Sequence, residues 1–97
     1  MELLIEKSWC VYMLKCADNT VYTGATNDLW SRLIAHNEGR AAKYTRGRGP
    51  VQLLAVCHVK SRSAALMLEH EVKQLSRQEK LRLVDTWREE TAVQISA

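Results

Sequence analysis

The pattern of hydrophobic and polar positions along the chain predicts three strands and three helices. β-branched, aromatic and other apolar residues dominate three short stretches, which we interpret as strands at residues 9–16, 20–25 and 51–59. Ala17-Asp18-Asn19 is a turn signal between the first two stretches, so we expect a hairpin there. The element order is β-β-α-β-α-α, and its short first connection rules out an all-parallel sheet. We therefore expect an α+β fold, with a small, mainly antiparallel three-stranded sheet flanked by helices.

The first helix is predicted between the hairpin and the third strand. Thr26 or Asn27 can cap its N-terminus, and it runs to about Glu38, where Gly39 is a natural stop. The expected core stripe of this helix consists of three apolar residues: Leu29, Leu33 and Ile34.

Two further helices are predicted after the third strand. Ser61 or Ser63 starts the first of them, and its apolar face is formed by Ala65, Leu68, Val72 and Leu75. Ser76-Arg77-Gln78-Glu79 has the spacing of a capping box, so a last helix begins there and ends near Trp87. We expect one domain at residues 8–88, an N-terminal extension at 1–7 and a frayed C-terminal tail at 89–97.

Composition and cysteine usage narrow the class of protein. The chain has 97 residues, which is one domain, and its hydrophobic fraction of 46% is typical of a globular protein. Its apolar runs are too short for a transmembrane span, and it lacks the pattern of a signal peptide. Three cysteines with no CxxC pair argue against a disulfide framework and against a zinc site. We expect a cytoplasmic protein that does not enter membranes.

The positive charge is concentrated in the middle third of the chain. Residues 1–38 sum to −2 and residues 69–97 to −1, whereas residues 39–68 contain no acidic residue and sum to +6. Such segregation suits a polyanionic partner, although a solvated basic loop is the alternative. The glycine-rich part of this segment, around Gly47 and Gly49, is typical of loops that bind phosphates. The candidate nucleic-acid-binding residues are Arg40, Lys43, Arg46, Arg48, Lys60 and Arg62.

Two tyrosines stand ten residues apart on the hairpin strands. Tyr12 and Tyr22 share a face of the sheet if the connection has an odd number of residues, and lie on opposite faces if the number is even. Tyrosines on strands are more often packing residues than chemical groups.

Three further polar side chains lie next to apolar helix faces. Arg32 and His36 are an i, i+4 pair at the edge of the first helix's stripe, so they can reach across the sheet or remain on the surface. Glu69 follows Leu68 directly, and the alternative to a functional role is an ordinary ion pair with Lys73. Together with the tyrosines these residues supply the groups that phosphodiester hydrolysis requires.

The ordered set of motifs resembles the GIY-YIG nuclease superfamily. The resemblance rests on Val11-Tyr12-Met13 and Val21-Tyr22-Thr23-Gly24, and on Arg32 and His36 at the following spacings. It continues with Gly47-Arg48-Gly49-Pro50 and with the helix segment from Ser63 to Glu69. It spans residues 8–84 and looks most like the small bacterial members that are little more than the nuclease domain.

The resemblance implies a role for each matching residue. Tyr22 would take a proton from water, Tyr12 would support it or contact the phosphate, and His36 would position or protonate nearby groups. Arg32 would hold the scissile phosphate, and Glu69 would be the single protein ligand of one Mg²⁺ or Mn²⁺ ion. The implied activity is metal-dependent cleavage of DNA, in repair or in the processing of unusual DNA structures.

Three positions depart from the superfamily's pattern. Cys10 and Thr23 stand where glycine and isoleucine are usual, and Ala25 replaces a lysine that some repair-type members carry. A catalytically weak nucleic-acid-binding module is therefore the second hypothesis. A third is an adaptor whose Trp87 anchors a partner protein. We expect a monomer or weak dimer, with specificity supplied by DNA shape or by a partner protein.

Overall fold

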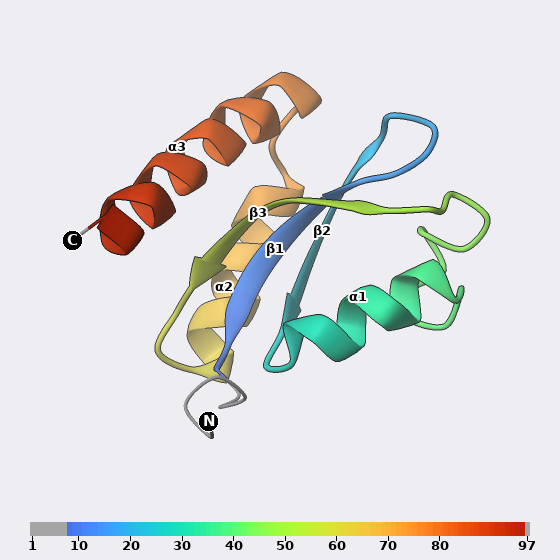
Figure 1. Ribbon diagram of the computed structural model, residues 1–97, viewed down its shortest axis with the longest axis horizontal. Coiled ribbons are helices and arrows are strands. Elements are labelled where there is room, and N and C mark those ends of the chain that lie inside the picture. Colours follow the sequence, from blue (N-terminus) through green and yellow to red (C-terminus); the bar gives the residue numbers. More distant parts are fainter. Residues whose placement is uncertain (1–7, 97) are drawn as a thin grey trace.

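The computed structural model describes residues 8–96 and contains the six predicted elements in the predicted order (Figure 1). The strands are β1 (Cys10–Lys15), β2 (Val21–Thr26) and β3 (Gln52–His58), and the helices are α1 (Leu29–Asn37), α2 (Arg62–Lys73) and α3 (Arg77–Ser96). The strand order is β2-β1-β3 with both pairs antiparallel, so the predicted α+β fold is confirmed. The expected N-terminal extension, residues 1–7, lies outside the described residues.

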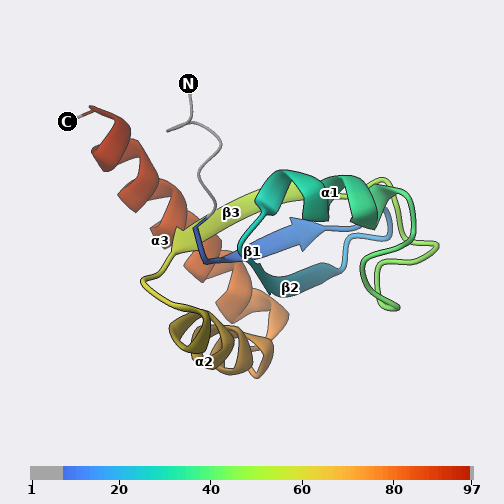
Figure 2. The ribbon, with the colours of Figure 1, turned by 90° about the horizontal axis from the view of Figure 1, so that it is seen from below.

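Helices cover both faces of the sheet. Figure 2 shows α1 on one face and α2 with α3 on the other. The core lies between the sheet and the α2–α3 layer, because alternate strand residues such as Val11, Met13 and Ala55 point there. The predicted apolar face of α2 is confirmed: Ala65 and Val72 are buried in this core, and Leu68 and Leu75 pack against it.

Side-chain caps fix where two of the helices begin. The Ser61 hydroxyl accepts a 3.1 Å hydrogen bond from the Ala64 amide, which makes Ser61, not Ser63, the cap of α2. The predicted capping box before α3 is present, because Ser76 and Glu79 exchange backbone-to-side-chain hydrogen bonds of 2.9 and 3.1 Å.

The predicted cap of α1 was wrong by one or two residues. Asp28 caps this helix and accepts a hydrogen bond from the Ser31 amide at 3.3 Å. Thr26 does not cap the helix, because its hydroxyl accepts a hydrogen bond from the amide of Asp28, the cap residue itself. Gly39 ends the helix as predicted, with a φ of +76° that favours glycine.

The last helix is longer than predicted. The sequence pattern ended it near Trp87 with a frayed tail after it, but α3 continues to Ser96. Residues 77–96 contain neither glycine nor proline, so nothing in the local chemistry stops the helix. None of the helices found in residues 8–96 is long and apolar enough to cross a membrane.

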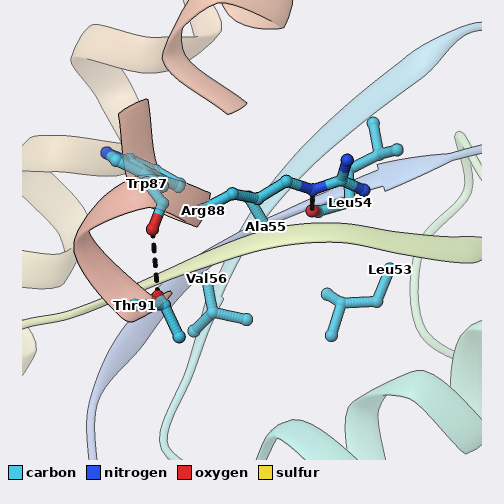
Figure 3. A pocket seen from close by; sticks show the side chains of 7 residues that line it. All are labelled: Leu53, Leu54, Ala55, Val56, Trp87, Arg88 and Thr91. Atoms are coloured by element: carbon cyan, nitrogen blue, oxygen red, sulfur yellow. Dashed lines mark hydrogen bonds between the residues drawn. The ribbon is translucent and has the colours of Figure 1, made fainter. Parts of the chain in front are cut away.

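Trp87 lies where α3 packs beside the edge strand β3 (Figure 3). Trp87 is only 5% exposed and belongs to the core, so the hypothesis that it anchors a partner protein is wrong. Arg88 reaches over the strand, and its Nε donates a 2.7 Å hydrogen bond to the Leu54 carbonyl oxygen. Trp87, Arg88 and Thr91 thus form the helix side of a groove beside β3.

Candidate active site

Tyr12 and Tyr22 share the sheet face that is covered by α1. The hairpin connection consists of residues 16–20, an odd number, and the Cα pairs across the strands include Tyr12 with Gly24 and Leu14 with Tyr22. Because side chains alternate between faces, the two rings emerge on the same side, with centroids 6.4 Å apart. Of the two arrangements that the sequence allowed, the structure therefore has the one in which both tyrosines lie on one face of the sheet.

His36 completes a cluster of three rings drawn from three elements. It is 1% exposed and lies at the centre of the buried side of α1, whereas Ile34, predicted as part of the core stripe, is 52% exposed. His36 Nε2 lies 2.8 Å from the Tyr12 hydroxyl, and its ring meets that of Tyr22 edge-on at 5.1 Å. The face of α1 that points toward the sheet is therefore centred on Leu29 and His36, and Ile34 lies outside it.

The hydrogen bonds around His36 define its tautomer. Thr45 Oγ1 donates to the Ala42 carbonyl oxygen at 3.2 Å, so toward His36 Nδ1, 2.7 Å away, it acts as an acceptor. Nδ1 thus carries the proton, and Nε2 accepts the hydrogen bond from the Tyr12 hydroxyl. Burial, followed by the charge of Arg32, lowers the pKa of His36, which keeps the imidazole neutral and preserves this arrangement.

The two tyrosines differ in their environments. Tyr12 is 1% exposed, and burial raises its pKa far above the ordinary value, so it is a neutral hydrogen-bond donor. Tyr22 is only half-buried. Burial also raises the pKa of Tyr22, but the charges of Lys73 and Arg32 lower it and Glu69 raises it. Tyr22 is therefore the phenol that faces both solvent and nearby cations.

Arg32 and Glu69 flank the ring cluster from two helices. Arg32 is exposed on α1, and its charge lowers the pKa of both tyrosines and of His36. Glu69 on α2 has a side chain that is 18% exposed and forms the predicted i, i+4 ion pair with Lys73 at 3.1 Å. Lys73 Nζ in turn lies 5.9 Å from the centre of the Tyr22 ring. Arg32 and Glu69 thus lie within electrostatic range of the two tyrosines that contact His36.

The loop between α1 and β3 contributes two residues that the sequence did not single out, Tyr44 and Thr45. Thr45 is the hydrogen-bond partner of His36 Nδ1, and Tyr44 stacks on Tyr22 with ring centroids 5.6 Å apart. Arg48 lies over the Tyr44 ring at 4.4 Å and pairs with Asp18 of the hairpin turn at 2.5 Å. Tyr44 and Thr45 lie in a loop without a periodic pattern of hydrophobic residues, so such a pattern could not point to them. The one signal in the sequence was an aromatic residue placed between the basic residues of this loop.

The six basic candidates fall into two groups at opposite ends of the sheet. The loop residues Arg40, Lys43, Arg46 and Arg48 lie near the end of β1, where the Ala17 amide donates to the Arg48 carbonyl. Lys60 and Arg62 follow β3 near the start of β1, where the Val59 amide donates to the Trp9 carbonyl. The length of β1, about 17 Å at the usual strand rise, separates the groups. Arg40 also pairs with Glu38 on the loop itself.

The chain is similar to known proteins over most of its length. The chain matches the profile of the GIY-YIG catalytic domain over residues 8–82. It is 53% identical to a UPF0213 protein of Natronomonas pharaonis over 74 residues, which cover 76% of this chain and 87% of that protein. It is 49% identical over 75 residues to a UPF0213 protein of Oceanobacillus iheyensis, covering 77% of this chain and 87% of that one.

Two solution NMR structures have the same fold. A UPF0213 protein from Bacillus halodurans is 46% identical, with a TM-score of 0.54 over 81% of this chain and 84% of that one. A protein from E. faecalis is 36% identical, with a TM-score of 0.59 over 84% of this chain and 88% of that one. The similarity therefore covers the sheet together with the elements that carry the ring cluster.

Proposed function

Since this chain belongs to the GIY-YIG family, we propose that it is a metal-dependent endonuclease that hydrolyses phosphodiester bonds in DNA. The observation that carries the proposal is the cluster of Tyr12, Tyr22 and His36, with Arg32 and Glu69 close enough to perturb the tyrosines. The family supports a nuclease, and the proposal adds the substrate, the metal dependence and a role for each residue of the site.

Tyr22 is the general base. It is the tyrosine with access to solvent, and two cations oppose the effect of burial on its pKa. Tyr12 supports Tyr22 by packing against its ring. Tyr12 does not contact the phosphate, because its hydroxyl is buried and donates to His36. Both nitrogens of His36 are engaged, by Tyr12 and Thr45, which suits a positioning role better than proton donation.

Arg32 binds the scissile phosphate. Its guanidinium is exposed on the same side of the sheet as the tyrosines and is close enough to lower the pKa of each. A planar guanidinium matches the geometry of phosphate oxygens and stabilises the charge that develops on them.

Glu69 is the residue that would hold the metal ion. Within residues 8–96 no group of three or more histidine, cysteine or acidic side chains forms a metal cage. One carboxylate, completed by water and phosphate oxygens, suits Mg²⁺, which retains several of its waters, and Mn²⁺ fits the same donor set. A bound ion would lower the pKa of the attacking water. The ion pair with Lys73 must open when Glu69 takes this role.

The basic loop is the proposed nucleic-acid contact beside the site. Lys43 and Arg46 are exposed, and the ion pair of Arg40 with Glu38 is exposed enough for phosphates to compete with it. Arg48 can contact a phosphate through the guanidinium N–H groups that its ion pair with Asp18 leaves free. Lys60 and Arg62 would meet the backbone a further strand length away. Two groups separated in this way can contact several successive phosphates of one DNA backbone. The substrate that we propose is an unusual DNA structure of the kind met in repair.

A second candidate function is a nucleic-acid-binding module that cuts poorly. The observation in its favour is that Glu69 is already neutralised by Lys73, in a chain whose second motif is followed by Ala25. Both functions predict salt-sensitive DNA binding, and they differ in cleavage.

The test is cleavage of supercoiled plasmid and of a labelled branched duplex, with Mg²⁺ and with EDTA. Tyr22→Phe is expected to lower the rate by about 10²–10⁴-fold, as for loss of a general base. Glu69→Gln is expected to abolish the response to metal, whereas Glu71→Gln, an exposed acid on the same helix, leaves the rate unchanged. Equal cutting by all variants points to a contaminant. Binding without any cutting establishes the second candidate.

A further inference from the structure

Tyr44 occupies an unusual position for a loop residue. Its ring stacks on the ring of Tyr22, with centroids 5.6 Å apart and planes inclined by 30°. The Arg48 guanidinium lies over the Tyr44 ring at 4.4 Å, and Asp18 holds that guanidinium in an ion pair. A chain of contacts thus runs from the hairpin turn through Arg48 and Tyr44 to Tyr22.

Tyr22 needs such a contact because of where it stands. It lies on β2, an edge strand, and is half-buried, so the sheet alone does not enclose its ring. His36 meets the ring edge-on at 5.1 Å, and Tyr12 is tilted against it at 6.4 Å. Tyr44 supplies the stacked contact, and it comes from a different segment than the other two.

We propose that Tyr44 is a positioning residue for Tyr22: its ring face, held by Arg48 and Asp18, fixes the orientation of the Tyr22 phenol. The inference deepens the proposed function and rests on Tyr22 being the base. Reaction rates depend on placing the base to within a fraction of an ångström, and residues that lock it are needed for that accuracy.

The stacking geometry specifies which atoms of Tyr44 matter. Stacking uses the ring face, and Tyr44 is 42% exposed, so neither its hydroxyl nor burial of its bulk is required. Phenylalanine can therefore replace Tyr44, whereas leucine, which is apolar but smaller and has no ring face, cannot. A residue that contacted the substrate through its hydroxyl would be impaired by both substitutions, because both remove that hydroxyl.

The test compares Tyr44→Phe and Tyr44→Leu on the branched duplex, with Trp30→Ala as control. Trp30 is another exposed aromatic residue, 77% exposed on α1, and has no part in the ring cluster. We expect Tyr44→Leu to lower kcat by about 10–10²-fold with KM unchanged, as for a misplaced catalytic group. Tyr44→Phe and Trp30→Ala are expected to match the unmodified protein.

NMR provides a readout that does not depend on cleavage. The nuclear Overhauser contacts between the rings of Tyr22 and His36 are expected to persist in Tyr44→Phe and to weaken in Tyr44→Leu. If the unmodified protein does not cut DNA, the proposed function fails, and these contacts still decide whether Tyr44 holds Tyr22. A rise in KM at constant kcat overturns the inference, as do unchanged kcat or unchanged ring contacts in Tyr44→Leu.

Discussion

Gly24 lies directly across the strand pair from Tyr12, and the Tyr12 ring passes over the space that a side chain at Gly24 would fill. A Cβ atom there would overlap the hydroxyl oxygen and the adjoining ring carbon of Tyr12. The glycine of the second motif is thus required by the tyrosine of the first. This close approach gives a physical reason for the two motifs to occur together.

Gly24→Ala is therefore expected to push Tyr12 away from His36. Overpacking of this kind costs about 1–3 kcal/mol of unfolding free energy, which denaturant titration measures. Gly49→Ala is the control, because a Cβ there would meet Asn37 Oδ1 at an ordinary 3.8 Å. Equal stability of Gly24→Ala and the unmodified protein would contradict the close approach.

Two buried threonines on β2 are expected to respond oppositely to the same substitution. Thr23 is 2% exposed, and its hydroxyl has no hydrogen-bond partner among the described residues. Thr23→Val removes that unpaired group and should stabilise the fold by about 1 kcal/mol. Thr26→Val should destabilise it by a similar amount, because Thr26 accepts the Asp28 amide. Thermal melting of both variants provides the measurement, and a lower melting temperature for Thr23→Val contradicts the argument.

The stability of the fold should depend on the protonation of His36. Burial lowers the pKa of His36 in the folded chain below its ordinary value of 6.5, so protons bind more readily to the unfolded chain. The stabilising contribution is present above about pH 6.5 and is lost as the pH falls through the folded-state pKa.

Urea titrations at pH 7.5 and pH 5 would measure this effect. His36→Gln should flatten the dependence, while His70→Gln, which removes an exposed imidazole from α2, leaves it in place. If His36→Gln retains the full pH dependence, some other group is responsible.

Binding of DNA should depend on salt through the basic loop. Arg46→Ala or Lys43→Ala is expected to reduce the slope of log K against log salt by about one unit for each phosphate that the variant no longer binds. Arg82→Ala removes an exposed charge from α3, which covers the face of the sheet opposite α1 (Figure 2), and is expected to leave the slope unchanged. Fluorescence anisotropy between low and moderate salt gives the slopes, and identical slopes for Arg46→Ala and Arg82→Ala would exclude the loop from DNA binding.

The strands, the element order and two helix caps were predictable because their signals are local. Ser76 and Glu79, for example, are three residues apart and satisfy each other's backbone amides. Whether Tyr12 and Tyr22 share a face of the sheet could not be predicted, because one residue more or less in the connection moves one of the two rings to the opposite face.

The burial of His36 could not be read from the helix pattern. An imidazole is buried at low cost only when both nitrogens find partners, and these come from Tyr12 on a strand and Thr45 on a loop. Neither partner is near His36 in the sequence. Tyr44 could not be identified from the sequence for the same reason, because its contacts with Tyr22 and Arg48 exist only in the folded chain, where the loop lies against the sheet.

Arg88 has a consequence for how the protein behaves at high concentration. An edge strand presents backbone groups on which a neighbouring molecule can add its own strand, and β3 is such an edge. By occupying the Leu54 carbonyl, Arg88 places a bulky cation along this edge, beside the exposed Leu53. The long helix α3 thereby acts as a guard against strand-to-strand aggregation, in addition to covering the core.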